Sequence, residues 1–215
     1  MLDAVNLSCE RGERVLFAGL EFAVAPGSLL RVAGPNGTGK TSLLRMLCGL
    51  LEPAAGEVRW HGRNIRRQRE EYWKNLVYVG HLNGVKDDLT VIENVKVAQA
   101  VAGRTVEHEA IRQALDAVGL ASFEHTIARR LSQGQRRRVA LARLFATTTA
   151  SLWILDEPFI ALDQRGVAAL SERIASHIHT GNMVVLVTHQ DVAIDVPRQQ
   201  HVELGSAASV AEAPC

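Results

Sequence analysis

The residues with the clearest potential for chemistry form one glycine-rich run, which follows an apolar segment and precedes a helical one. The run consists of Gly34, Pro35, Asn36, Gly37, Thr38, Gly39, Lys40, Thr41 and Ser42. Glycines let a backbone curl so that successive N–H groups point at phosphate oxygens, and the following helix start adds its positive dipole end. Lys40 can reach the β- and γ-phosphates of a nucleotide, and the Thr41 hydroxyl can bind Mg²⁺. The run therefore predicts a phosphate-binding loop, since a chance glycine-rich turn does not explain this strand–loop–helix setting.

Two adjacent carboxylates, Asp156 and Glu157, end the apolar segment Leu152–Leu155. Side chains alternate along a strand, so neighbouring residues at its end can take different roles. Asp156 is predicted to hold Mg²⁺ through water, and Glu157 to orient and deprotonate an attacking water. On this segment alone, an acidic surface turn explains the residues equally well. The upstream loop makes that alternative the weaker one and favours hydrolysis of a nucleotide.

A third segment, Leu131–Gln135, reads LSQGQ and stands shortly before the acidic strand. It resembles the LSGGQ signature of the ABC ATPases. Ser132 at a helix start, Gly134 for close backbone approach and the positive helix end would form a second phosphate grip, with Gln135 beside them. The arginines that follow, Arg136–Arg138, are interpreted mostly as a solvated helix face.

Further residues resemble the ABC ATPases in the expected order. Ala161–Asp163 matches the loop that contacts the opposing subunit, and His189 matches the histidine that senses the γ-phosphate. The resemblance extends from Leu2 to Leu204. It implies an α/β fold of the P-loop NTPase type and hydrolysis of ATP with Mg²⁺. It also implies catalytic roles for Lys40, Glu157 and His189.

The chain departs from the family pattern at three places. His81 stands where many ABC ATPases have a glutamine that touches Mg²⁺ and water, and a neutral imidazole can still donate or accept one hydrogen bond. No aromatic residue is aligned near Arg11 to stack on adenine, so either the Arg11 guanidinium stacks or Phe17 replaces the aromatic ring. Gln133 stands where glycine is common, which leaves Ser132 and Gly134 to make the key contacts.

Three short sequence segments indicate a branch of the family: Gly80-His81, Trp153–Phe159 and Arg136–Leu144. They are similar to the ATP-binding subunits of bacterial cytochrome c maturation systems, also called haem exporter ATP-binding proteins. This resemblance implies a homodimer of ATPase subunits, attached through a membrane permease subunit to the cytoplasmic face of the inner membrane. Direct haem binding is not expected, because there is no CxxCH motif and His177 and His179 face different directions on one predicted helix.

The elements that must position these residues alternate between short apolar runs and longer helical patterns, which predicts a mainly parallel α/β core. The expected strands are Leu2–Ser8, Leu20–Val24, Leu29–Ala33, Glu57–Trp60, Leu76–Val79, Leu152–Leu155, Met183–Val187 and His201–Leu204. The expected helices are Lys40–Leu50, Thr90–Val101, Glu107–Val118, Gln133–Thr147 and Gln164–His179. Residues 1–204 are interpreted as one ABC ATPase domain with a helical subdomain inserted at about 81–147, and residues 205–215 as a disordered tail.

Composition limits the function classes. A net charge of +1 argues against binding to nucleic acid or to a membrane surface. The 3 cysteines are scattered without metal-ligand spacing, which is typical of reduced thiols in the cytosol. The longest mostly apolar stretch, Leu43–Leu51, contains Arg45 and is too short to span a bilayer. No signal peptide is recognised at Met1. A membrane role would therefore require a partner.

Three alternatives to the cytochrome c reading are weighed. The chain could be the ATP-binding subunit of another ABC transporter, because the branch rests on fewer residues than the family does. A soluble ABC ATPase acting on ribosomes or DNA would usually carry tandem cassettes or a coiled-coil insertion, and the sequence has one cassette and no heptad run. A P-loop kinase leaves Leu131–Gln135 and His189 unexplained.

Overall fold

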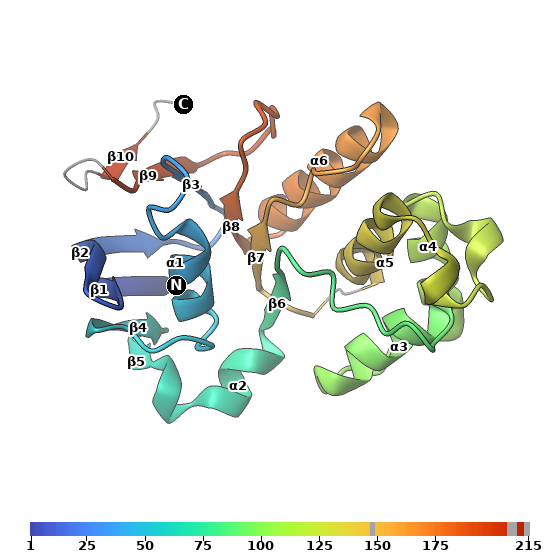
Figure 1. Cartoon of the computed structure of the whole chain (residues 1–215), viewed down its shortest axis with the longest axis horizontal. Helices are drawn as coiled ribbons and strands as arrows, with labels where there is room; N and C mark the ends of the chain where they lie inside the picture. Colours follow the sequence, from blue (N-terminus) through green and yellow to red (C-terminus); the bar gives the residue numbers. More distant parts are fainter. Residues whose placement is uncertain (147–148, 206–209, 213–215) are drawn as a thin grey trace.

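The computed structural model describes residues 1–146, 149–205 and 210–212, and its strands form two sheets (Figure 1). The first sheet is antiparallel with the order β2-β1-β4-β5. Its strands are β1 (Leu2–Arg11), β2 (Arg14–Val24), β4 (Ala55–Trp60) and β5 (Arg63–Asn64). The second sheet has the order β10-β9-β3-β8-β7-β6. Its strands are β3 (Leu29–Ala33), β6 (Leu76–Val79), β7 (Leu152–Asp156), β8 (Met183–Val187), β9 (Gln199–Glu203) and β10 (Val210–Glu212).

The second sheet carries the predicted site and is parallel except for β10, which runs antiparallel to β9. Two neighbouring inner strands, β7 and β8, are buried along their whole length. Both faces are covered, as continuous apolar strands require. Helix α1 (Lys40–Leu47) packs on one face, in a hydrophobic cluster that also includes side chains of the first sheet. Helices α5 (Gln133–Ala146) and α6 (Gln164–His179) pack on the other face.

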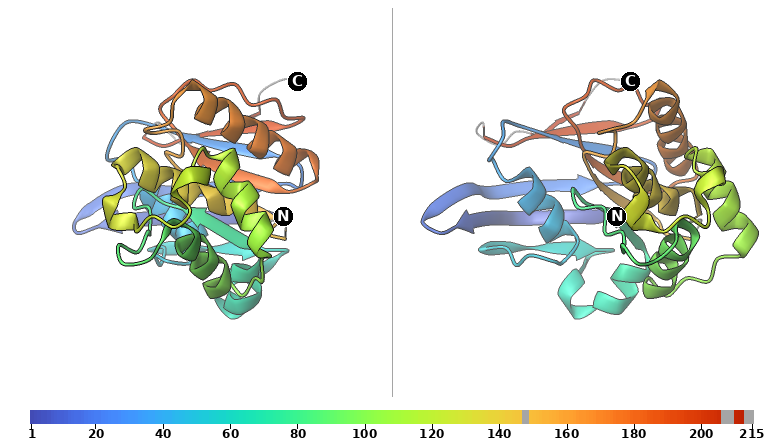
Figure 2. Two further views of the ribbon diagram at one scale, coloured as in Figure 1. Left: turned by 90° about the vertical axis from the view of Figure 1, so that its right-hand side faces the viewer. Right: turned by 45° about the vertical axis from the view of Figure 1, so that its right-hand side comes forward.

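Between β6 and β7 the chain forms a helical region, seen at the side of the molecule in Figure 2. Helices α3 (Val91–Val101) and α4 (His108–Ala117) pack against α5 around a hydrophobic cluster of their own. The side chain of Thr90 and that of Glu93 form a reciprocal capping box that starts α3. Helix α5 belongs to both clusters, with Leu141 facing the sheet and Val139 facing α3 and α4. It therefore joins the helical region to the strands.

The predicted parallel core is confirmed, but the strands of the first part of the chain form an antiparallel sheet that was not predicted. β1 and β2 form an antiparallel hairpin that closes at Arg11 and Arg14, across Gly12 with its positive φ of 62°. The second strand begins at Arg14 and not at Leu20, because residues 14–19 show no alternation of apolar and polar types: Val15 and Ala18 are apolar but exposed. The resulting sheet lies apart from the parallel one, with α1 between them.

Several smaller boundaries also differ. Helix α1 ends at Leu47 and not at Leu50, because Gly49 takes a left-handed conformation and the Leu50 N–H turns back to the Arg45 carbonyl. The short β5 and the helix α2 (Arg69–Lys74) were not predicted. The tail predicted to be disordered contains β10, so that prediction does not hold for Val210–Glu212, while 206–209 and 213–215 lie outside the described residues. Thr147, predicted to end a helix, also lies outside them. No helix in the described part of the chain has the length and apolar character that a membrane span needs.

Candidate nucleotide site

The glycine-rich run forms the loop between β3 and α1, and two of its glycines are required by their surroundings. Gly34 has a φ of 137°, and a Cβ placed on it would lie 2.3 Å from the Leu204 carbonyl oxygen. Gly39 has a φ of 101°, and a Cβ there would lie 3.1 Å from the Phe17 ring. Both conformations are strained for residues with a side chain. The loop can therefore curl tightly just before Lys40, the first residue of α1.

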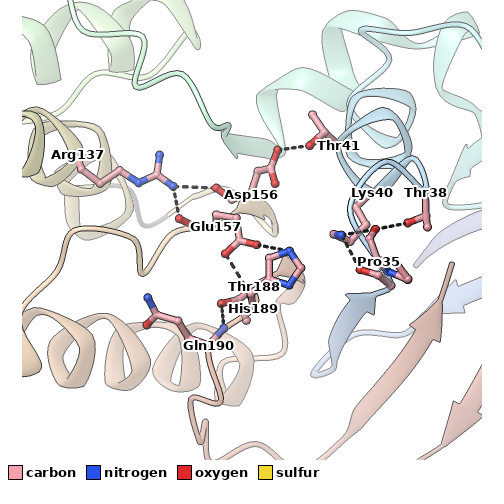
Figure 3. A network of polar contacts seen from close by, with 11 residues as sticks. Pro35, Thr38, Lys40, Thr41, Arg137, Asp156, Glu157, Thr188, His189 and Gln190 are labelled. Carbon is pink, nitrogen blue, oxygen red and sulfur yellow. Dashed lines mark hydrogen bonds and ion pairs between the residues drawn. The ribbon is translucent and has the colours of Figure 1, made fainter. Parts of the chain in front are cut away.

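The Lys40 ammonium lies inside this curl (Figure 3). Its Nζ donates to the Gly34 carbonyl at 2.6 Å and to the Pro35 carbonyl at 2.9 Å. The Thr38 hydroxyl also donates to the Pro35 carbonyl, at 2.9 Å. Lys40 is largely buried, and the hydrogen-bond partners of its charge within the described part of the chain are neutral carbonyl oxygens. Because charge-assisted bonds are stronger than bonds to neutral groups, a phosphate oxygen is a better partner for this cation.

Across the cleft, Asp156 ends β7 next to the first turn of α1. The Thr41 hydroxyl donates to Asp156 Oδ2 at 3.0 Å, and Asp156 is only 2% exposed. A hydroxyl and a carboxylate are oxygen donors of the kind that Mg²⁺ prefers. The loop brings them together beside the Lys40 ammonium, at the start of a helix (Figure 3). The donor set therefore fits a magnesium ion that also contacts phosphate.

Glu157, the residue after β7, has a left-handed backbone with a φ of 50°, which is uncommon for a residue with a side chain. Its N–H donates to the Val187 carbonyl at 2.9 Å, which ties it to the end of β8. Its Oε2 accepts from the His189 N–H at 3.3 Å, and His189 Nε2 lies 3.5 Å from its Oε1. Strained residues of this kind persist where the surroundings hold them, often at functional sites. The turn aims the carboxylate at His189 and the cleft (Figure 3).

These groups line one cleft of about 780 Å³. The predicted residues in its wall are Arg11, Asn36, Gly37, Gly39, Lys40, Thr41, Ser42, His81, Asp156, Glu157 and His189. Arg14, Leu16, Ile160, Val187 and Gln190 also line it and were not predicted. Cationic side chains therefore face carboxylates across a space that can accept a nucleotide.

The LSQGQ segment lies elsewhere: among the described residues that line this cleft, none belongs to 131–135. The Ser132 N–H donates to Gln135 Oε1 at 2.9 Å, and the Gln135 N–H donates to Ser132 Oγ at 3.2 Å. This reciprocal pair is a capping box that starts α5. The side chain of Gln135 is thus engaged in its own helix end. A Cβ on Gly134 would lie 3.3 Å from the Ala161 carbonyl oxygen, so the segment packs against the loop that precedes α6.

Comparison with known proteins decides the family. Residues 16–160 match the family model described as ABC transporter. A curated relative from Aromatoleum aromaticum, named cytochrome c biogenesis ATP-binding export protein CcmA, is 53% identical over 92% of this chain and 92% of its own. A relative of the same name from Pseudomonas aeruginosa is 49% identical over 96% of this chain and 100% of its own. The chain belongs to the CcmA family of ABC transporter ATPases.

Solved structures agree with this membership at the level of the fold. A dimeric ATP-binding cassette, in a post-hydrolysis state with ADP and phosphate, superposes with a TM-score of 0.84 over 100% of both chains at 21% identity. An ATP-binding subunit of an ABC transporter gives a TM-score of 0.81 at 24% identity, over 94% of this chain and 85% of its own. The predicted α/β P-loop fold is thereby confirmed, and the curated relatives confirm the predicted family.

The structure changes the interpretation of two features, Phe17 and the arginine run. Phe17 is 8% exposed, belongs to the hydrophobic core and packs against Gly39, so the alternative that its ring stacks on adenine is wrong. Arg11 remains in the cleft wall, with Arg14 and Leu16 nearby on the hairpin. Neither of these two neighbours was predicted, because their side chains precede the part of β2 that the apolar alternation marked.

The arginine run is not simply a solvated helix face. Arg136 pairs with Asp87 at 2.7 Å and Arg138 with Asp163 at 3.0 Å, whereas Arg137 is 5% exposed. The burial of Arg137 could have been predicted from its spacing along the helix. Arg137 shares one face of α5 with Ala140, Leu141 and Leu144, at intervals of three, four and seven residues.

Proposed function

We propose that this chain is the ATP-hydrolysing motor subunit of a membrane export complex that serves cytochrome c biogenesis. The observation that carries the proposal is the cleft in which Lys40, Asp156, Glu157 and His189 converge, in a chain about half identical to relatives named as ATP-binding export proteins of that process. ATP is the ligand for which the loop between β3 and α1 is shaped. The catalytic and binding roles below follow from the contacts described above.

The phosphate loop binds and orients ATP. The backbone N–H groups of the loop after Pro35 would face the phosphates, and Lys40 would exchange its bonds to Gly34 and Pro35 for bonds to the β- and γ-phosphates. Thr41 and Asp156 would hold Mg²⁺, Asp156 through water, and the ion would supply positive charge next to the phosphates. His81, exposed in the same cleft, would offer a hydrogen bond to the ion's water. Arg11 contacts the base or sugar through its guanidinium.

Glu157 is the general base for the attacking water. Its backbone turn and the His189 N–H hold its carboxylate at the cleft, and its Oε1 has no hydrogen-bond partner among the described residues. The carboxylate is thereby placed to accept a proton from an attacking water. His189, whose Nε2 lies 3.5 Å from Glu157 Oε1, would contact the γ-phosphate. The pair thus aligns water and phosphate for an in-line displacement.

A second copy of the chain completes the site. Ser132 and Gly134, with the positive start of α5, would cover the γ-phosphate held by the other copy's Lys40 in a head-to-tail homodimer. The absence of residues 131–135 from the described lining of the cleft supports this arrangement. Gln135 contributes by capping the helix that carries the grip. The domain layout predicted from the sequence, with a helical subdomain at about 81–147 inserted in 1–204, places the grip on that subdomain.

The complex includes a membrane permease subunit of the CcmB type, and the chain is held by it at the cytoplasmic face of the bacterial inner membrane. Closure of the dimer on ATP and reopening after hydrolysis would drive haem delivery, or release of a haem-loaded chaperone. Neither nucleic acid nor haem is proposed as a direct ligand of this chain. The alternatives are another ABC transporter or, with less support, an ABC ATPase without a transport role.

Deleting the gene should abolish c-type cytochromes and leave b-type cytochromes unchanged, because only the c-type require covalent haem attachment after export. Haem-stained gels and difference spectra of membranes measure both classes. A plasmid carrying the wild-type gene should restore the c-type, and one carrying Lys40→Ala should not. A deletion strain with normal c-type cytochromes would reject the cytochrome c assignment and leave an ABC motor of another pathway.

His81 gives a second test of the site. His81→Gln should keep ATPase activity within about threefold of wild type, because glutamine also offers a donor and an acceptor. His81→Ala should lower it by about tenfold or uncouple it from the permease, because the group beside the ion is lost. Turnover is measured with and without the permease in proteoliposomes. If both variants match wild type in the assembled complex, the role given to His81 is wrong.

A further inference from the structure

Arg137 lies at the junction of three functional segments, and none of the assigned roles uses it. Its Nη1 donates to the Gly80 carbonyl at 2.7 Å and to Asn83 Oδ1 at 3.2 Å. Its Nη2 donates to the carbonyls of Asp156 and Glu157, both at 2.8 Å. Figure 3 shows the guanidinium aimed at the backbone of the two carboxylates. One planar group therefore connects the segment after β6 with the end of β7.

Burial makes these contacts energetically important. Burial lowers the pKa of Arg137, while the charges of Asp156 and Glu157 raise it, so the group stays cationic inside the protein. Bonds from a charged donor to buried carbonyls are stronger than bonds between neutral groups. Arg137 is therefore a fixed part of the interior, unlike Arg136 and Arg138, whose partners are exposed carboxylates.

The contact with Glu157 bears on the geometry of the proposed base. The left-handed turn at Glu157 is held by its N–H on Val187, by His189 on its carboxylate and by Arg137 on its carbonyl. Removing the guanidinium leaves that carbonyl without its charged donor and lets the peptide rotate. Because the carboxylate follows the backbone, its distance from His189 and from the attacking water would change.

The other arm of the guanidinium contacts the segment 80–83, which carries His81 into the cleft and Leu82, 85% exposed, to the surface. Helix α5 itself begins at Gln133, directly after the capping residue Ser132. The fork of Arg137 is rigid, so its two arms cannot move independently. A shift of segment 80–83 or of α5 therefore changes the contacts that Arg137 makes with the backbone of Glu157.

We propose that Arg137 is a positioning residue that makes the orientation of the Glu157 carboxylate depend on segment 80–83 and on α5. The proposal rests on the role of Glu157 as the general base. It gives a physical route from the surface beside Leu82 and from the LSQGQ helix to the reacting water. Binding of ATP does not require this route, because the hydrogen bonds that Arg137 makes within the described residues go to other segments than the phosphate loop.

The variants Arg137→Gln and Arg137→Lys test the proposal in the purified full chain. Arg137→Gln should lower kcat by about 10²-fold, the effect of misplacing a catalytic group by about 1 Å, while the Kd for ATP changes by less than about threefold. Arg137→Lys should remain impaired, because a point charge cannot bond both carbonyls and segment 80–83 together. The matched control is Arg143→Gln, a half-buried arginine of the same helix that lies outside the cleft lining, and its kcat should equal wild type. Thermal unfolding of each variant sets a temperature at which all are folded.

A double-variant cycle separates positioning from a general structural role. In a Glu157→Gln background, Arg137→Gln should lower the residual rate by less than about threefold, because the group that Arg137 positions is already gone. A full 10²-fold further loss in that background would overturn the proposal, as would wild-type kcat in Arg137→Gln. Normal turnover in Glu157→Gln alone would instead refute the assigned base. A low rate in Glu157→Gln with silent Arg137 variants would refute only this inference.

Discussion

The Glu157→Gln variant should bind ATP as the wild-type chain does and hydrolyse it about 10²- to 10⁴-fold more slowly, the usual contribution of a general base. Glutamine keeps the size of the side chain and can still contact the His189 N–H, which now lies 3.3 Å from Glu157 Oε2. It cannot accept a proton from water at neutral pH. Single-turnover hydrolysis and equilibrium binding of ATP, measured on the same preparation, separate the two effects.

Two other substitutions serve as comparisons for Glu157→Gln. Lys40→Ala should weaken ATP binding itself, because the phosphates lose the cation that the Gly34 and Pro35 carbonyls now hold. Glu172→Gln removes an exposed carboxylate from α6, outside the cleft, and should leave both binding and turnover unchanged. Wild-type turnover in purified Glu157→Gln protein would show that another group activates the water.

The parts of the site that could be predicted from the sequence are those in which function and local structure share one short segment. The phosphate loop must curl where its glycines are, and the acidic pair must end a strand because the strand itself is a continuous apolar run. Gly34 and Asp156 therefore lie where their segments predicted. The cleft results from the parallel order of β3, β8 and β7, which places the ends of these segments at one edge.

What the sequence did not predict depends on contacts between distant segments. The hairpin of β1 and β2 pairs as a separate sheet, and no local pattern distinguishes that pairing from membership of the parallel sheet. Phe17 was a candidate for adenine because it is aromatic and near Arg11, but its place in the strand directs it into the core against Gly39. Arg137 was grouped with its charged neighbours, although its spacing from Leu141 and Leu144 put it on the buried face of α5. The charge of Arg137 suggested that its side chain is exposed. In the structure it is buried, because four oxygen atoms accept hydrogen bonds from its guanidinium.

Mixing two inactive variants, Lys40→Ala and Ser132→Arg, should restore about a quarter of wild-type ATPase activity. In a head-to-tail dimer each site combines Lys40 of one copy with Ser132 of the other. Either variant alone has a defect in both sites. A mixed dimer has one site with both defects and one site with none. Random pairing makes about half of the dimers mixed, and one of their two sites is intact, which gives the quarter.

The structure makes Ser132→Arg a suitable partner in this test. The Ser132 hydroxyl accepts the Gln135 N–H at the start of α5, so the change also removes a helix cap worth about 1 kcal/mol. Restored activity would itself show that the variant folds, because the intact site of the mixed dimer uses the Lys40 of the Ser132→Arg chain. Ser122→Arg, the same substitution at an exposed serine away from the start of α5, should be fully active alone. Size-exclusion chromatography with light scattering should find dimers when ATP is bound and hydrolysis is blocked by Glu157→Gln. If mixtures stay inactive while each variant is folded, or if a strictly monomeric chain is fully active, Ser132 does not act on the site of a second copy.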